Sequence, residues 1–258
     1  MMRKMLQTLY KTSLLKRLVP SLLKIFVKLF SLNEVIVRNK DVSFILNLMN
    51  PIDREIYLKG SYEKEQINFL SEQIKKNNIN FFLDIGAHMG FYSINISKNN
   101  ISTYSFEPVK KNFEQLKKNK ILNNVDNIFL YNIALSNKKK NIQMWVPDKN
   151  KTGGFSIYDS NDEELSKYDK EKTFKIESKS DLGDNLMDFK DEKIAIKIDV
   201  ERHEKNVLDG TANILNNNKI IIQIELFEER KKEIFNHLKK NNYIHFHTIK
   251  KDYYFKNF

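Results

Sequence analysis

Short, almost wholly apolar runs alternate with amphipathic stretches over most of the chain after residue 60. Strands that are buried on both faces carry continuous hydrophobicity, whereas helices repeat their apolar positions every three to four residues. The predicted strands are INFFLDIG, STYSFEP, NIFLYNIAL, IAIKIDV, KIIIQIEL, YIHFHTI and YYFKN, and the predicted helices are a stretch near 62–76, FYSINISK, VKKNFEQLKKN, EKNVLDGTANIL and ERKKEIFNHLKKN. Strands separated by helices indicate an α/β fold, in which helices cover both faces of a mostly parallel sheet.

Two segments break this alternation. EVIVRNKDVSFILNL, residues 34–48, alternates apolar and polar positions around an Arg-Asn-Lys-Asp turn, which predicts a small β-hairpin. Residues 137–176 are expected to form a strand-and-loop insertion, in which residues 150–158 either cover the substrate or form a solvated loop with no such role. We therefore divide the chain into a basic lead-in with the hairpin, residues 1–60, and a main domain, residues 61–258.

The first 30 residues carry seven Lys or Arg and no acidic residue. Leu22, Ile25, Phe26 and Leu29 recur there at helical spacing beside two lysines, and Pro20 is expected to separate two short helices. No apolar run approaches the ~18–20 residues that span a bilayer, and lysines interrupt any signal-peptide core. Three interpretations remain open: a helical lead-in packed on the domain or a partner, an amphipathic segment lying on an anionic membrane surface, or a disordered segment.

The formal net charge of +11 is concentrated at the N-terminus. Residues 1–50 hold nine basic and two acidic side chains, whereas residues 51–258 hold 35 basic and 31 acidic ones. Because basic and acidic side chains nearly balance in residues 51–258, this part of the chain does not require a basic groove for nucleic acid. We therefore do not expect a nucleic-acid partner. The chain contains no cysteine, which excludes disulfides, thiolate metal sites and cysteine nucleophiles, and fits a cytoplasmic location. If residues 1–30 lie on a membrane surface, the protein is peripheral at the cytoplasmic face of that membrane.

The first strand of the main domain ends in LDIGAHMGFYS. In open parallel sheets, ligands bind beyond the carboxyl ends of the strands. Gly86 and Gly90 frame a tight turn there and are expected to let backbone amides approach a ligand, although a purely structural turn is the alternative. Their spacing differs from the dinucleotide fingerprint, and the preceding Asp84 suits a positive amino group better than a pyrophosphate.

The second strand ends at Glu107, 17 positions after Gly90. An acidic residue at this strand tip is placed to accept hydrogen bonds from both hydroxyls of a ribose. Together with an acid suited to an amino group, Glu107 predicts a site for an adenosine that carries an amino acid. S-adenosylmethionine fits that description.

The chain resembles the FkbM-type methyltransferases in five motifs between about residues 62 and 226: FLDIGAHMGFYS, YSFEP, IALS, IKIDVERHEKNVLDG and IIIQIEL. The resemblance implies a Rossmann-like class I methyltransferase fold, with a seven-stranded sheet whose last strand is antiparallel. It also implies S-adenosylmethionine as methyl donor and a hydroxyl, often on a sugar, as acceptor. By family position, Asp84, Gly86 and Gly90 would surround the methionine part of the methyl donor, with Glu107 at its ribose and Ala134 at the adenine edge. Ala87 and His88, in the same turn, are also expected to bind the cofactor.

Arg202 departs from the pattern of that family, which has glycine after the D-V-E sequence. A larger side chain at a close-packed turn either alters the acceptor pocket or points outward.

The fourth motif contains KIDVERHE, residues 197–204. Because side chains alternate along a strand, Asp199, Glu201 and His203 are expected to project together if the extended conformation persists. An alcohol acceptor must lose its proton as it is methylated, so we expect His203 or Asp199 to act as base and Glu201 to orient the hydroxyl. Alternatively, Glu201 and Glu204 only favour the next helix and His203 only lines the mouth.

A divalent metal ion held by Asp199, Glu201 and His203 is a weaker alternative. The His-Phe-His sequence at 245–247 lacks a third ligand nearby and is expected to be ordinary strand, while Glu225 and Tyr62 are expected at the pocket rim. The sequence thus predicts an S-adenosylmethionine-dependent O-methyltransferase for a carbohydrate or similar polyol. A nucleic-acid methyltransferase and a catalytically silent binding module are the alternatives.

Overall fold

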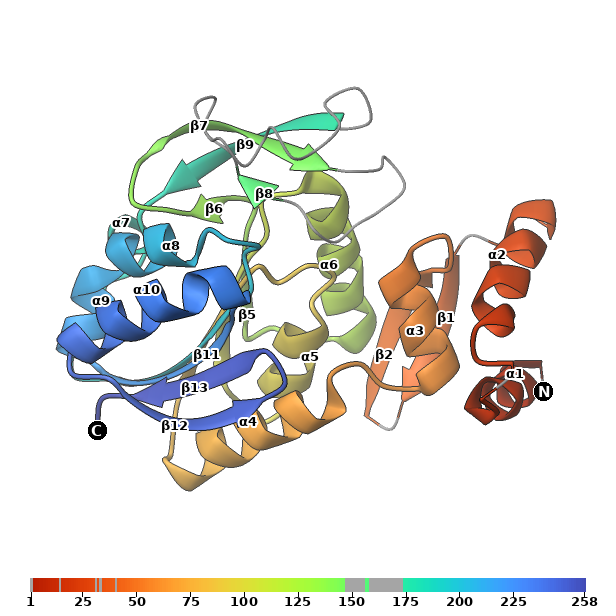
Figure 1. Cartoon of the computed structure of the whole chain (residues 1–258), viewed down its shortest axis with the longest axis horizontal. Coiled ribbons are helices and arrows are strands. Elements are labelled where there is room, and N and C mark those ends of the chain that lie inside the picture. The colour runs from red at the N-terminus through yellow and green to blue at the C-terminus, as the bar shows by residue number, and fades with distance from the viewer. Residues whose placement is uncertain are drawn as a thin grey trace.

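The structure is a computed structural model that describes residues 2–13, 15–30, 32, 34–39, 41–146, 156–157 and 174–258. Within these residues a seven-stranded sheet forms the centre of the molecule (Figure 1), with the order β12-β13-β11-β10-β3-β4-β5. Its strands are β3 (Phe81–Ile85), β4 (Ser102–Phe106), β5 (Ile128–Tyr131), β10 (Lys193–Ile198), β11 (Lys219–Glu225), β12 (Ile244–Ile249) and β13 (Asp252–Lys256). Strand β13 runs antiparallel to the other six strands, which confirms the predicted Rossmann-like α/β fold with an antiparallel last strand.

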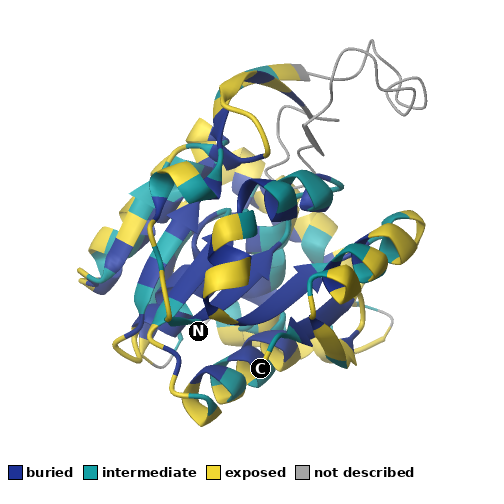
Figure 2. Ribbon diagram, turned by 90° about the vertical axis from the view of Figure 1, so that its left-hand side faces the viewer, coloured by how far each residue is buried: buried dark blue, intermediate teal, exposed yellow. Residues whose placement is uncertain are grey.

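Helices cover both faces of this sheet, and its strands form a buried layer between them (Figure 2). Helices α4 (Lys64–Lys76) and α5 (Phe91–Ser97) pack on one face, with α6 (Lys110–Asn123) beside α5. The other face is covered by α8 (Glu204–Gly210), α9 (Ala212–Asn217) and α10 (Glu228–Lys240), next to the short α7 (Gly183–Leu186). The single helix expected over EKNVLDGTANIL is therefore wrong, because the chain breaks at Thr211.

A second sheet lies beside the first and includes most of the described residues of the predicted insertion, residues 137–176. It contains β6 (Ala134–Leu135), β9 (Phe174–Asp181), β7 (Lys140–Val146) and β8 (Ser156–Ile157), in that order. The prediction of one strand over NIFLYNIAL is wrong: the chain turns at Asn132, whose side-chain amide donates to the Glu107 carbonyl at 2.8 Å, and β6 joins the second sheet. Apart from β8, the predicted loop at 150–158 lies outside the described residues.

The N-terminal segment forms α1 (Met2–Lys11), α2 (Leu18–Phe30), the predicted hairpin β1 (Glu34–Asn39) and β2 (Val42–Asn47), and α3 (Pro51–Lys59). Pro20 does not separate α1 from α2. It lies in the first turn of α2, where the missing N–H removes no helical hydrogen bond. Among the described residues, no helix has the length and apolarity needed to cross a membrane.

Side chains of α6 attach the hairpin to the main domain. Asn119 Oδ1 accepts from Ile45 N at 2.7 Å and Asn123 Oδ1 accepts from Ser43 N at 2.8 Å, so α6 pairs with part of the β2 backbone. One hydrophobic cluster also runs from α2 and β2 to α5 and β5. The proposed boundary at residue 60 stays a prediction, but the apolar core continues across it.

Candidate active site

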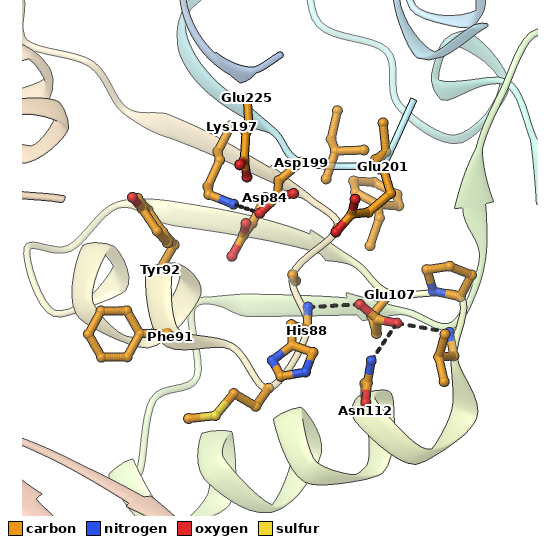
Figure 3. A pocket seen from close by; sticks show the side chains of 18 of the residues that line it. Asp84, His88, Phe91, Tyr92, Glu107, Asn112, Lys197, Asp199, Glu201 and Glu225 are labelled. Carbon is orange, nitrogen blue, oxygen red and sulfur yellow. Dashed lines mark hydrogen bonds and ion pairs between the residues drawn. The ribbon is translucent and has the colours of Figure 1, made fainter. Parts of the chain in front are cut away.

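A cavity of about 570 Å³ opens beyond the carboxyl ends of β3, β4, β10 and β11. It lies where the strand order reverses between β3 and β10, which is the usual ligand position in such sheets. Nine of the ten site residues expected from the sequence line it: Asp84, Gly86, Ala87, His88, Glu107, Ala134, Asp199, Glu201 and His203. Gly90 does not. Figure 3 shows two groups in this cavity, one around Glu107 and the other around Lys197.

The glycine turn follows β3, and three of its N–H groups are bonded within the protein. Gly86 N and Ala87 N both donate to the Phe106 carbonyl at 3.0 Å, and His88 N donates to Glu107. Gly86 has φ +86°, and a Cβ there would lie 1.9 Å from the Asp199 carbonyl oxygen. The glycine is thus required for the close approach of β3 and the end of β10.

Gly90 has a packing role instead. Its φ is also +86°, and a Cβ there would lie 2.2 Å from Leu116 Cδ1 on α6. The turn therefore holds the sheet and α6 together, and the cavity wall it forms is fixed by steric fit.

Asp84 is buried at the end of β3. Its Oδ2 accepts from Ser93 N at 3.0 Å and from Ser93 Oγ at 2.5 Å, whereas its Oδ1 has no hydrogen-bond partner among the described residues. Burial raises the pKa of this carboxyl, although Lys197 acts in the opposite direction. A buried acceptor without a partner at a cavity wall is suited to a cationic ligand group.

Glu107 follows β4 and is held by backbone N–H groups. Its Oε2 accepts from His88 N at 2.8 Å, and its Oε1 accepts from Val109 N at 2.9 Å and Asn112 Nδ2 at 3.4 Å. Burial raises the pKa of Glu107 to about 7. A carboxylate accepts about four hydrogen bonds, so Glu107 retains capacity for a ligand hydroxyl.

Ala134 belongs to an apolar part of the wall next to Glu107. It is clustered with Val109 and with Met144 of the insertion strand β7, and all three line the cavity. The second sheet therefore contributes directly to the site. This surface is suited to a flat apolar ring face.

A row of polar side chains crosses the sheet at its cavity end. Asp84 lies opposite Ser105 of β4 and Lys197 of β10, and Lys197 lies opposite Gln223 of β11. All four are buried, although the preceding positions on the same face of β3, β10 and β11 are apolar. Burial of such polar side chains costs folding free energy unless they form hydrogen bonds or ion pairs.

Lys197 is the centre of this row. Its Nζ lies 2.9 Å from Asp199 Oδ2 and 4.7 Å from the centroid of the Tyr92 ring. Burial alone would lower the pKa of Lys197, but Asp199, Glu63 and Asp84 together raise it well above the usual value. Lys197 therefore remains an ammonium group among carboxylates. Lys197 was not predicted from the sequence, although a single charge within the apolar run IAIKI was a usable signal.

Two further carboxyl groups line the cavity near Asp199: Glu225 lies beside Lys197, and Glu201 lies on the other side of Asp199 (Figure 3). Burial, with repulsion by Asp199 next, raises the pKa of Glu201 to about 7 and that of Glu225 to about 8. Both groups therefore change protonation near neutral pH. Glu225 and Tyr62 line the cavity, as the sequence indicated.

The extended conformation expected as far as His203 ends earlier. Strand β10 stops at Ile198, and Glu201 and Arg202 have φ of +50° and +76°. His203 Nε2 lies 3.0 Å from Ser136 Oγ, and its Nδ1 lies 3.0 Å from the Asn206 side-chain amide. Burial lowers the pKa of His203 to about 4, so this imidazole is a weak base, and the identity of the base stays a prediction.

Arg202 points away from the cavity. Its Nη2 lies 2.8 Å from Glu229 Oε1, and its guanidinium lies 4.2 Å from the centroid of the Phe227 ring. The φ of +76° explains why glycine suits this position, and contacts with α10 stabilise the arginine there. The acceptor pocket is therefore not filled by this departure.

The predicted metal alternative has no support from geometry. The described residues contain no group of three or more His, Asp or Glu side chains arranged to hold a metal ion. At the His-Phe-His sequence, His245 packs near Phe235 and His247 stacks on Phe69. Both imidazoles thus pack against aromatic rings, as ordinary strand residues do.

Comparison with known proteins gives one family match, to a model described as "Methyltransferase FkbM domain", over residues 84–245. None of the curated proteins compared with the chain matches it. Among solved structures, FkbM from Methylobacillus flagellatus KT has 14% identity and a TM-score of 0.45, covering 78% of this chain and 52% of that one. M. jannaschii TYW2 in complex with AdoMet has 14% identity and a TM-score of 0.41, covering 87% and 84%. Magnesium protoporphyrin IX methyltransferase from Synechocystis PCC 6803 with bound SAM has 9% identity and a TM-score of 0.45, covering 80% and 82%.

Proposed function

Because the chain belongs to the FkbM methyltransferase family, whose methyl donor is S-adenosylmethionine, we propose that it methylates a hydroxyl group of a carbohydrate or similar polyol. The observation that carries this proposal is the cluster of carboxyl side chains near Lys197, which lines the same cavity as Asp84 and Glu107. One part of the cavity suits the methyl donor, and the other offers proton acceptors to an alcohol.

The residues present fit S-adenosylmethionine. Asp84 Oδ1 is a buried acceptor in need of a donor group, which an ammonium group would supply. Glu107 has capacity for a ribose hydroxyl, and the surface formed by Val109, Ala134 and Met144 suits an adenine. When bound, the cofactor supplies an electrophilic methyl group on a sulfonium centre.

Asp199 is the group we assign as proton acceptor for the hydroxyl. It follows β10 at the reversal of strand order and lines the cavity. Lys197 Nζ, 2.9 Å from Asp199 Oδ2, holds this side chain in place at the cavity wall. Glu201 lies on the same wall and is suited to orient the hydroxyl.

The charge of the cavity supports a neutral acceptor. Its lining contains six carboxyl groups and one lysine: Glu63, Asp84, Glu107, Asp199, Glu201 and Glu225, with Lys197. An acceptor with phosphate or carboxylate groups close to the reacting hydroxyl would be repelled by these groups. A neutral polyol is not, and its hydroxyls can donate to the carboxylates.

Methyl transfer from labelled S-adenosylmethionine to a panel of neutral sugars, sugar phosphates, RNA and protein extracts tests the proposal. We expect a methyl ether on a neutral sugar or polyol, identified by mass spectrometry and by the carbon chemical shift of the methyl group. Transfer only to a nitrogen or carbon atom, or only to RNA or protein, would overturn it. Donor binding without transfer to any of these acceptors would favour a binding module.

A further inference from the structure

Helix α2 has two apolar stripes, of which the fold uses one. Val19, Leu23 and Val27 recur every fourth residue and are almost fully buried in the hydrophobic cluster that includes α3 and the hairpin. This inner stripe accounts for the packing of α2 on the rest of the chain. The outer stripe has no such explanation.

The outer stripe consists of large aliphatic side chains that face solvent. Leu18, Leu22, Ile25 and Leu29 follow the helical spacing i, i+4, i+7 and i+11, with exposed fractions of 53%, 61%, 56% and 75%. Phe30, 61% exposed, extends the apolar surface at the end of the helix. Contiguous exposed apolar surface of this kind marks an interaction site, whereas single exposed apolar residues do not.

The charges around this stripe indicate which partner it fits. Lys24 and Lys28 are exposed along one side of the helix, and Lys16 and Arg17 are exposed just before it. The first acidic residue of the chain is Glu34. A second copy of this chain would bring lysines against lysines, whereas an anionic lipid surface offers apolar depth for the stripe and phosphates for the cations.

We propose that the outer stripe of α2, Leu18, Leu22, Ile25 and Leu29, docks the protein on an anionic lipid bilayer, with the helix parallel to the membrane plane. Helix α2 lies at the outer end of the molecule (Figure 1) and packs on α3, whose residues Pro51, Ile52 and Ile56 line the cavity. Docking through α2 thus places the cavity one helix away from the membrane. The proposal does not depend on which acceptor is methylated.

Flotation of the full chain with vesicles tests the docking. One vesicle set contains phosphatidylcholine alone, and the other contains phosphatidylcholine and phosphatidylglycerol in equal parts. We expect binding only to the second set, and weaker binding at high salt. The double variant Ile25→Gln/Leu29→Gln should bind at least about tenfold more weakly, because two aliphatic side chains no longer enter the apolar layer.

A matched control is available elsewhere on the surface. Ile121 and Ile244 are 70% and 67% exposed, so Ile121→Gln/Ile244→Gln removes similar side chains and should leave vesicle binding unchanged. Lys24→Gln/Lys28→Gln should weaken vesicle binding by about fivefold per lysine, because each lysine near an anionic surface strengthens binding by about that factor. The exposed lysines of α10 provide its control, Lys232→Gln/Lys239→Gln.

Three results would overturn the proposal. The first is no binding of the folded chain to anionic vesicles, and the second is equal binding by Ile25→Gln/Leu29→Gln and the wild type. The third is a concentration-dependent dimer that these two substitutions dissociate while vesicle binding is absent, which would assign the stripe to a second copy of the chain. None of these results bears on methyl transfer, which is measured separately with soluble acceptors.

Discussion

The two halves of the cavity hold their carboxyl groups in different ways. At β3 and β4, backbone N–H groups hold the carboxylates: Ser93 N donates to Asp84, and His88 N and Val109 N donate to Glu107. At β10 and β11, the charge of Lys197 balances Asp199 and Glu225. The first half is thus fixed by the fold, whereas the second depends on one side chain.

Removing that side chain should have the largest effect. Lys197→Met leaves Asp199, Asp84 and Glu63 without their cation, and breaking a buried pair costs about 3–5 kcal/mol. We expect turnover to fall about a hundredfold or more. Its pH profile should shift upward, because Lys197 lowers the pKa of Glu225, and without the lysine this carboxyl group holds its proton to higher pH. Steady-state kinetics over a range of pH, with a melting curve for each variant, measures this.

Lys193 offers the control on the same strand. Its Nζ donates to the Asn77 carbonyl at 3.0 Å, away from the cavity, so Lys193→Met should keep turnover and pH profile near those of the wild type. Lys197→Arg should recover part of the activity, because it restores the charge. Wild-type turnover and an unchanged pH profile in Lys197→Met would contradict the role assigned to this ammonium group.

The fixed half should be most sensitive to steric change. Gly86→Ala places a Cβ against the Asp199 carbonyl, whereas Gly60, with φ +79°, has only the Gln7 and Arg3 side chains within 4 Å. We expect Gly60→Ala to cost about 1–2 kcal/mol of unfolding free energy through its φ alone. Gly86→Ala should cost at least about 2 kcal/mol more, since backbone must move. Chemical denaturation of both variants tests this, and equal losses would show that the close approach is unimportant.

The fixed half was also the more predictable one. Asp84, Gly86 and Glu107 were predicted as site residues because each lies at the end of an apolar strand, and the end of such a strand can be recognised in the sequence. The roles of these residues were harder to predict. Gly86 N and Ala87 N donate to the Phe106 carbonyl within the protein, and this depends on the position of Phe106 on the next strand.

The other half was harder to predict for specific reasons. Glu201 and Arg202 adopt positive φ, a conformation that neither residue type indicates in a sequence. The alternation of side chains along the strand was therefore predicted to extend as far as His203, which is too far. Lys197 was overlooked inside an apolar strand. Helix α3 was not predicted, although Asn50 and Pro51 form an ordinary cap and first turn.

His203 should give the smallest effect. Its pKa of about 4 and its two ring contacts suggest a structural role, so His203→Ala should lower turnover by less than about tenfold while reducing unfolding free energy by about 1–2 kcal/mol. Asp199→Asn, the comparison variant, should lose about a hundredfold or more in turnover. The reverse order of the two turnover losses would restore His203 as the base.

Calorimetric titration of S-adenosylmethionine into the wild type and Glu107→Gln tests the account of the methyl-donor half most directly. Burial raises the pKa of Glu107 to about 7, so its carboxylate is ionised, and accepts from a ribose hydroxyl, mainly above that pH. Wild-type affinity should therefore rise between about pH 6 and about pH 8, by at most about tenfold per unit. Glu107→Gln should bind at least about tenfold more weakly, with a smaller dependence on pH. No binding to the folded wild type, or equal affinity and equal pH dependence in the variant, would contradict the account.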